Sequence, residues 1–224
     1  MTLRGRSTLE FELAELNNNI LKLGSLTEEA IDLAMGALKG NSHVMAQRVI
    51  AGDEQINLLR YKIEQDCLRL LATQFLVASD LRRVIAVIHI ASELERIGDH
   101  ASGIARLVKR MDSQTPIVNL YQLPKMASRA QKMVRTSLQA YVSQDLEMAR
   151  RVIDRDEKID RQYGKFLQIM LEEMTQSEGG VEVTIPTYLL WMAHNLERIG
   201  DRVTNIAERI IFMVSGEFVE LDSD

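Results

Sequence analysis

A six-residue string, LERIGD, occurs twice in this 224-residue chain, at Leu94–Asp99 and again at Leu196–Asp201, an offset of 102 positions. A second pair of matching strings lies upstream of it. DEQINLLRY at Asp53–Tyr61 corresponds to DEKIDRQY at Asp156–Tyr163, at an offset of 103. Self-similarity at such an offset indicates two copies of one structural unit. The duplication therefore constrains the architecture more than any other feature of the chain.

Helical periodicity runs through both copies, because apolar residues recur at steps of three and four and only 3 prolines occur in the whole chain. Glycines and prolines separate six periodic segments, and short connections between them favour antiparallel neighbours. We predict an all-α fold of six long helices, arranged as two tandem, pseudo-symmetric three-helix bundles at residues 1–114 and 115–224. The helices are expected at about residues 8–38, 42–74, 80–111, 120–143, 145–176 and 186–214. The string VEVTIP, at residues 181–186, could be briefly extended.

Composition narrows the class of protein. The formal net charge is −5, which argues against nucleic-acid binding by a clustered basic face. The single cysteine, Cys67, cannot form an internal disulfide, and we expect a buried structural thiol in a reducing compartment. The first residues lack the apolar segment of a secretory signal, and the longest apolar run, Val84–Ala91, is far shorter than the ~20 residues of a spanning helix. We expect a cytoplasmic protein without membrane insertion.

Four pairs of oxygen-bearing side chains, each spaced four residues apart, are the candidate metal ligands. Residues four apart lie on one face of a helix, and the pairs in LERIGD point away from the apolar stripe. Antiparallel packing would bring a pair from the second helix of each copy next to a pair from the third. The candidates are Asp53 and Asn57 with Glu95 and Asp99 in the first copy, and Asp156 and Asp160 with Glu197 and Asp201 in the second.

Close carboxylate pairs repel one another unless a cation lies between them, and oxygen-rich sites suit magnesium, manganese, calcium or iron. Gly98 and Gly200, beside the acids, each cost their helix ~1 kcal/mol relative to alanine, which indicates close approach of a neighbouring backbone or bound group. The alternative is that the acids only face solvent. His194 lies on the acidic face, but Ser92 stands at its position in the first copy, so any ligand role would be confined to one site.

No catalytic motif is evident, and we predict that the protein is not an enzyme. The chain contains no Glu-x-x-His, no H-E-x-x-H, no P-loop and no G-x-G-x-x-G. The remaining histidines are predicted to have structural positions and no catalytic role. His89 lies in an apolar run and is predicted to be buried in the core, His100 is predicted to lie at the surface, and His43 is predicted to begin the second helix.

The strings ASDLRRVIAVIHIASELERIGDHASGIA, GDEQIN and HNLERIGDRVTNIAERI resemble the PhoU family, the accessory regulators of bacterial phosphate-specific transport. The resemblance extends over essentially the whole chain. It implies a metal-binding signature, E(D)-x-x-x-D, in each bundle, which holds iron clusters or other metals such as zinc, manganese or magnesium. Carried over by position, it nominates the same eight residues. Asn57 departs from the carboxylate pattern, so we expect the first site to hold metal less tightly or with fewer ions.

The resemblance also implies regulation rather than turnover. Family members link the ATPase subunit of the phosphate transporter to a phosphate-sensing histidine kinase and thereby keep phosphate-starvation genes quiet when phosphate is plentiful. It implies a homodimer as well. Two alternatives stay open: a metal-independent helical adaptor with the same partners, and a metallo-enzyme that uses an open metal position.

Overall fold

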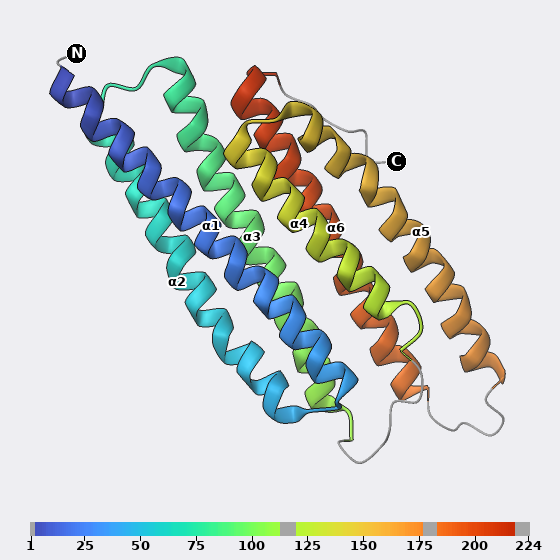
Figure 1. The fold of residues 1–224 in the computed structure, drawn as a ribbon. Helices are drawn as coiled ribbons and strands as arrows, with labels where there is room; N and C mark the ends of the chain where they lie inside the picture. Colours follow the sequence, from blue (N-terminus) through green and yellow to red (C-terminus); the bar gives the residue numbers. More distant parts are fainter. Residues whose placement is uncertain (1–2, 113–119, 177–182, 218–224) are drawn as a thin grey trace.

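The computed structural model of the chain describes residues 3–112, 120–176 and 183–217 (Figure 1). Within these ranges it contains six helices and no strand, so the all-α prediction is confirmed. The helices are α1 Leu3–Lys39, α2 His43–Thr73, α3 Ala78–Arg110, α4 Leu123–Ser143, α5 Leu146–Gln176 and α6 Thr184–Ser215. The predicted boundary between the bundles, after residue 114, lies outside the described residues. None of the described helices has the length and apolar character that a membrane span requires.

Several helix ends differ from the predicted positions. α6 begins two residues before Pro186, because a proline in the first turn lacks only an N–H that would have no partner there. Pro124 occupies the first turn of α4 for the same reason. The described part of the segment predicted to be extended is not extended: Val183 has φ −68° and ψ −5°, and the next residues are helical. α3 begins at Ala78 rather than near residue 80.

The turn between the first two helices of each repeat is built in the same way. Asn41 and Gln144 both adopt the left-handed region, with φ of 43° and 54°. The next residue in each case is an N-cap whose side chain accepts a hydrogen bond from the backbone N–H three residues on, at 3.3 Å for Ser42 and 2.9 Å for Asp145. The two turns are 103 residues apart, so the offset read from the sequence also applies to the backbone.

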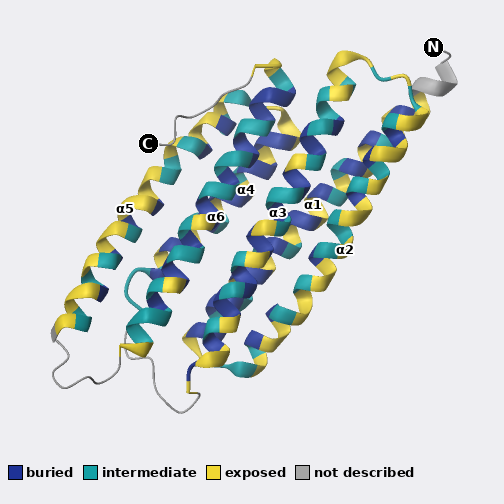
Figure 2. Cartoon of the chain, turned by 180° about the vertical axis from the view of Figure 1, so that it is seen from behind, coloured by how far each residue is buried: buried dark blue, intermediate teal, exposed yellow. Residues whose placement is uncertain are grey.

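Each repeat forms a three-helix bundle, and the two bundles lie side by side with α3 and α6 between them (Figure 1). The contact between α3 and α6 is the most extensive one in the molecule, and α1 also packs against α4. Among the described helices, α2 contacts only α1 and α3, and α5 contacts only α4 and α6. Buried residues therefore concentrate on the inner helices, whereas α2 and α5 show exposed residues along their length (Figure 2).

Polar contacts cross the seam between α3 and α6. His100 Nδ1 lies 3.1 Å from Asn195 Oδ1, and Glu93 pairs with Arg202 at 3.6 Å. His100 is half-buried and burial lowers its pKa, so the prediction of a surface position is wrong. His89 is exposed, so its predicted core position is wrong as well. The first error arises because α3 packs against α6 as well as α1 and α2, which buries a face beyond its main apolar stripe. The second arises because His89, although flanked by apolar residues in the sequence, lies on a part of α3 that stays exposed.

Candidate metal centres

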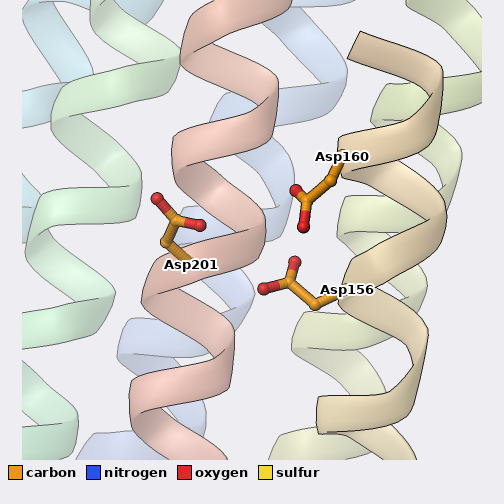
Figure 3. A group of neighbouring side chains, drawn as sticks. All are labelled: Asp156, Asp160 and Asp201. Atoms are coloured by element: carbon orange, nitrogen blue, oxygen red, sulfur yellow. The ribbon is translucent and has the colours of Figure 1, made fainter. Parts of the chain in front are cut away.

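Three carboxylates meet between α5 and α6. One oxygen from each of Asp156, Asp160 and Asp201 lies within 4.8 Å of the others. Figure 3 shows Asp156 and Asp160 one turn apart on α5, both projecting towards α6, which carries Asp201. In the described part of the chain, no other trio of histidine, cysteine, aspartate or glutamate side chains comes this close. We call these three residues, together with Glu197, the second acidic cluster.

Asp156 is the most perturbed member of the second acidic cluster. Burial raises its pKa to about 7, and the charges of Asp160, Asp201 and Glu197 add to the rise, whereas a hydrogen bond from Thr204 Oγ1 to Asp156 Oδ2 at 2.9 Å opposes it. The other oxygen, Oδ1, is buried and has no hydrogen-bond partner among the described residues. An ionised carboxylate in this position lacks the compensation that burial demands.

Gly200 allows Asp156 to lie against the backbone of α6, since a Cβ at residue 200 would overlap Asp156 Oδ1. The same relation holds in the first repeat in a looser form. A Cβ at Gly98 would lie 2.9 Å from Ile56 Cδ1 and 3.8 Å from Asp53 Oδ1. A neighbouring group does approach both LERIGD glycines closely, but it consists of side chains of the neighbouring helix and not of the backbone or bound group that was expected.

Glu197 sits beside His194 and Arg198. Its Oε2 lies 3.3 Å from His194 Nδ1 and 3.7 Å from Arg198 Nε, although neither contact has hydrogen-bond geometry. Burial raises the pKa of Glu197 and lowers the pKa of His194. Arg198 also donates to Asp201 at 3.0 Å. His194 packs against the rings of Tyr163 and Trp191, at centroid distances of 5.9 and 6.0 Å.

The first acidic cluster consists of Asp53, Asn57, Glu95 and Asp99, between α2 and α3. Burial raises the pKa of Asp53 and of Glu95, and the charge of Asp99 raises both further. Asp53 Oδ1 is buried without a hydrogen-bond partner among the described residues, as Asp156 Oδ1 is in the second cluster. Asp99 itself is exposed. The structure thus places Asp53 near Glu95 and Asp99, as antiparallel packing predicted.

Two arginines distinguish the first cluster from the second. Arg60 lies 3.9 Å from Glu95, and Arg106 lies 3.9 Å from Asp53. The corresponding positions in the second repeat hold Tyr163 and Glu208. These arginines were not predicted from the sequence, although each lies seven residues, about two helical turns, after a candidate ligand and so on the same face.

The donor atoms fit a hard cation. The candidate ligands are carboxylate oxygens and one amide carbonyl oxygen, and the lone cysteine, Cys67, is fully buried in the core. Each cluster contains a buried carboxylate oxygen that has no hydrogen-bond partner in the described part of the chain, and this is the atom that a bound cation would satisfy. Four carboxylates face one guanidinium group in the second cluster. In the first, three face Arg60, Arg106 and Arg96, the last of which lowers the pKa of Glu95.

Comparisons with known proteins agree with this layout. A family model described as the PhoU domain matches residues 20–108 and again residues 123–210. A protein named phosphate-specific transport system accessory protein PhoU homolog, from Clostridium acetobutylicum, is 34% identical over 218 residues, which cover 97% of this chain and 99% of the relative. The protein named phosphate-specific transport system accessory protein PhoU from Serratia marcescens is 36% identical, covering 93% of this chain and 85% of the relative.

Solved structures show the same fold. The phosphate transport system regulatory protein PhoU from Streptococcus pneumoniae superposes with a TM-score of 0.88 at 33% identity, over 95% of this chain and all of that chain. PhoU from Pseudomonas aeruginosa superposes with a TM-score of 0.86 at 32% identity, over 93% of this chain and 99% of that one. With two matches to the family model and similarity along nearly its whole length, the chain belongs to the PhoU family.

Proposed function

We propose that this chain is an accessory regulator of phosphate uptake and phosphate-starvation signalling that binds metal ions at its two acidic clusters. The regulatory part of the proposal is supported by the names of its relatives, which describe accessory and regulatory proteins of phosphate transport. The metal-binding part is supported by the geometry of the clusters. Its partners are the ATPase subunit of the phosphate transporter and a phosphate-sensing histidine kinase, as expected from the family resemblance.

One observation carries the metal-binding proposal: Asp156, Asp160 and Asp201 approach to within 4.8 Å, and a buried oxygen of Asp156 finds no hydrogen-bond partner among the residues that the structure describes. Like charges at this distance raise one another's pKa, and a divalent or trivalent cation removes the repulsion. Bound metal would hold α5 against α6, since the ligands come from both helices. Iron is the proposed metal, with zinc, manganese and magnesium as alternatives for the same oxygen donors.

The two clusters differ in their need for a cation. Arg60 and Arg106 already supply positive charge to the first cluster, and Asn57 replaces one of its carboxylates. The second cluster has Arg198 as its main cationic partner. We therefore propose that the second cluster fills first and retains metal longer on dialysis against a chelator. The change R60Y/R106E, which copies the second repeat, should strengthen metal binding at the first cluster.

Regulation by contact between proteins requires no catalytic group, and we propose that the chain is not an enzyme. Metal bound across α5 and α6 would stiffen the outer helix of the second bundle and thereby the surface that a partner meets. The family resemblance adds a homodimer and an indirect, negative effect on the transcription of phosphate-starvation genes.

The direct test is metal analysis of protein purified without added metal. We compare wild type with D156N/D160N, and use D154N/E157Q as the control because it removes the same charge from exposed positions of the same helix. The proposal predicts a marked loss of metal in D156N/D160N and wild-type content in the control. Equal metal content in all three proteins would refute the metal sites and leave a metal-independent adaptor. Turnover of a phosphoester panel that disappears in D156N/D160N would identify a metallo-enzyme instead.

A further inference from the structure

A basic groove lies along the seam between α4 and α5. Two adjoining hollows of about 460 and about 220 Å³ form it, and both have Arg129 and Lys158 in their walls. Among the described residues, no carboxylate lines either hollow. The cationic side chains of this basic groove come from both helices: Lys125, Arg129 and Lys132 from α4, and Arg155, Lys158, Arg161 and Lys165 from α5.

This concentration of charge does not follow from the composition. The chain is acidic overall, with a net charge of −5, and it contains eight lysines. All four lysines of the second repeat, at positions 125, 132, 158 and 165, line the basic groove. A cluster of positive charge on a chain whose net charge is negative creates a local positive potential, which attracts anions to that place.

The arginines of the basic groove are held in position, while its lysines are free to bind. Arg129 donates to the backbone carbonyl of Lys158 at 3.1 Å, and Arg155 donates to Thr136 Oγ1 at 3.2 Å. Arg161 pairs with Glu157 at 3.5 Å, and both side chains are largely exposed. The ammonium groups of the four lysines make no hydrogen bond or ion pair with any described residue. They are available to a ligand without loss of an existing contact.

The internal duplication supplies a comparison within the same molecule. An equivalent hollow of about 160 Å³ lies between α1 and α2 in the first repeat. Its walls include residues that precede those of the basic groove by 103 positions, but they carry no cluster of positive charge. Leu26, Glu29, Gly52 and Gln55 stand where the second repeat has Arg129, Lys132, Arg155 and Lys158. The hollow is thus common to both repeats, whereas its basic lining is specific to the second.

The dimensions and lining indicate the class of anion. From Arg155 to Lys165 the basic groove follows α5 for about 15 Å, at 1.5 Å per residue. A single phosphate ion would engage only part of this length, whereas linked phosphates would meet cations along all of it. Lysine and arginine are the usual ligands of phosphate oxygens. None of the described residues that line the basic groove is aromatic, so these residues offer no platform for stacking a base.

We propose that the basic groove binds an oligophosphate, a chain of linked phosphate groups that is either inorganic or part of a nucleotide. The proposal is independent of the metal sites, because the carboxylates of α5 point towards α6 and the lysines line the seam with α4 (Figure 3). The same protein could therefore hold cations on one face of α5 and a polyanion on the other.

The test is isothermal titration calorimetry of the full chain with inorganic triphosphate, in a buffer that contains a metal chelator. Wild type is compared with K125Q/K132Q/K158Q/K165Q and with the control K22Q/K39Q/K62Q/K109Q, which removes the same charge from exposed lysines of the first repeat. We expect triphosphate to bind wild type and the control alike. The groove variant should bind on the order of tenfold more weakly or not at all, and added salt should weaken binding to wild type. All eight lysines are exposed, so both variants should fold.

Titrations with other ligands show which kind of oligophosphate the basic groove binds and whether it prefers oligophosphates to other anions. ATP that binds as tightly as triphosphate would support recognition of the phosphate chain alone, and tighter binding of ATP would support a nucleotide as the source. Equal affinity for orthophosphate, or for an oligoglutamate peptide of equal charge, would overturn the proposal. It would also be overturned by equal losses in the two quadruple variants or by the absence of binding to wild type. Binding that persists in D156N/D160N would separate this groove from the acidic cluster.

Discussion

Replacement of Asp156 by asparagine should stabilise the metal-free protein, and the gain should grow with pH. Asparagine keeps an oxygen to accept the hydrogen bond of Thr204 Oγ1 and places an NH₂ group where Asp156 Oδ1 has no partner. The neighbouring carboxylates of Asp160 and Asp201, which approach Asp156 to within 4.8 Å, are the available acceptors for that group. The substitution therefore removes a buried charge without leaving a cavity.

The sign of the pH dependence follows from proton binding in the two states. An aspartate in the unfolded chain ionises near its ordinary pKa of 3.8, whereas native Asp156 keeps its proton until about pH 7. Between these values the native state binds more protons than the unfolded state. The free energy of unfolding of the metal-free wild type therefore falls as the pH rises through this window and levels off above it. The D156N variant lacks this contribution.

The size of the effect comes from the same shift. A change in pKa from 3.8 to about 7 corresponds to about 4 kcal/mol at alkaline pH. Part of this loss of folding stability is already present at pH 5, because the carboxyl is ionised in the unfolded chain at that pH. Residual contact of Asp156 with solvent reduces the remaining loss. We expect the stability advantage of D156N to grow by about 2–3 kcal/mol between pH 5 and pH 8.5, or roughly 4–12 °C in Tm for a chain of this size.

The assay is urea and thermal unfolding of both proteins at pH 5 and pH 8.5 with chelator present. Histidines with lowered pKa, at His89, His100 and His194, oppose the trend below pH 6.5, but they occur in both proteins and largely cancel in the difference. D154N is the control, because Asp154 is exposed on the same helix. A D156N advantage of equal size at both pH values, or the same increase in D154N, would refute the reasoning.

Three further predictions concern the packing of the chain. G200A should displace the Asp156 carboxylate and reduce metal content at the second acidic cluster, whereas G164A, where an added Cβ meets nothing within 4 Å, should stabilise the protein by up to about 1 kcal/mol. F166A should destabilise by about 3–5 kcal/mol in urea unfolding, because Phe166 is fully buried; a loss below 1 kcal/mol would show that the core collapses around it. Burial raises the pKa of Cys67 to about 12, so a thiol reagent should label it only after denaturation, and rapid labelling of the native protein would contradict its buried position.

The internal repeat allowed the number of helices, the pairing of helices and the location of the acidic clusters to be predicted from the sequence. Matching strings at a constant offset require matching surroundings, and residues four apart on a helix necessarily share a face. Cys67 was expected to be buried and is buried, and His43 was expected to begin the second helix and does so. These predictions depended only on local periodicity and on the duplication.

Features that depend on how the helices pack against one another could not be predicted in the same way. His89 was predicted to be buried and is exposed, and His100 was predicted to lie at the surface and is half-buried. Both predictions were wrong because no pattern within α3 shows which face meets α6. Arg60 and Arg106 were not predicted because their contacts with the acidic residues depend on how far each side chain reaches across to the neighbouring helix. The basic groove likewise forms only when α4 lies against α5, so that charges far apart in sequence become neighbours.

The pairing of α3 with α6 and of α1 with α4 has an evolutionary consequence. Each repeat presents its own first and third helices to the other, which is the geometry of a two-fold symmetric pair. An ancestral gene for a single repeat would have encoded a chain whose third helix packed on its own first and second helices and buried its remaining face by meeting an identical copy. Fusion made that encounter independent of concentration. It also released the halves from having to be identical, so that one could acquire Arg60 while the other acquired Arg129.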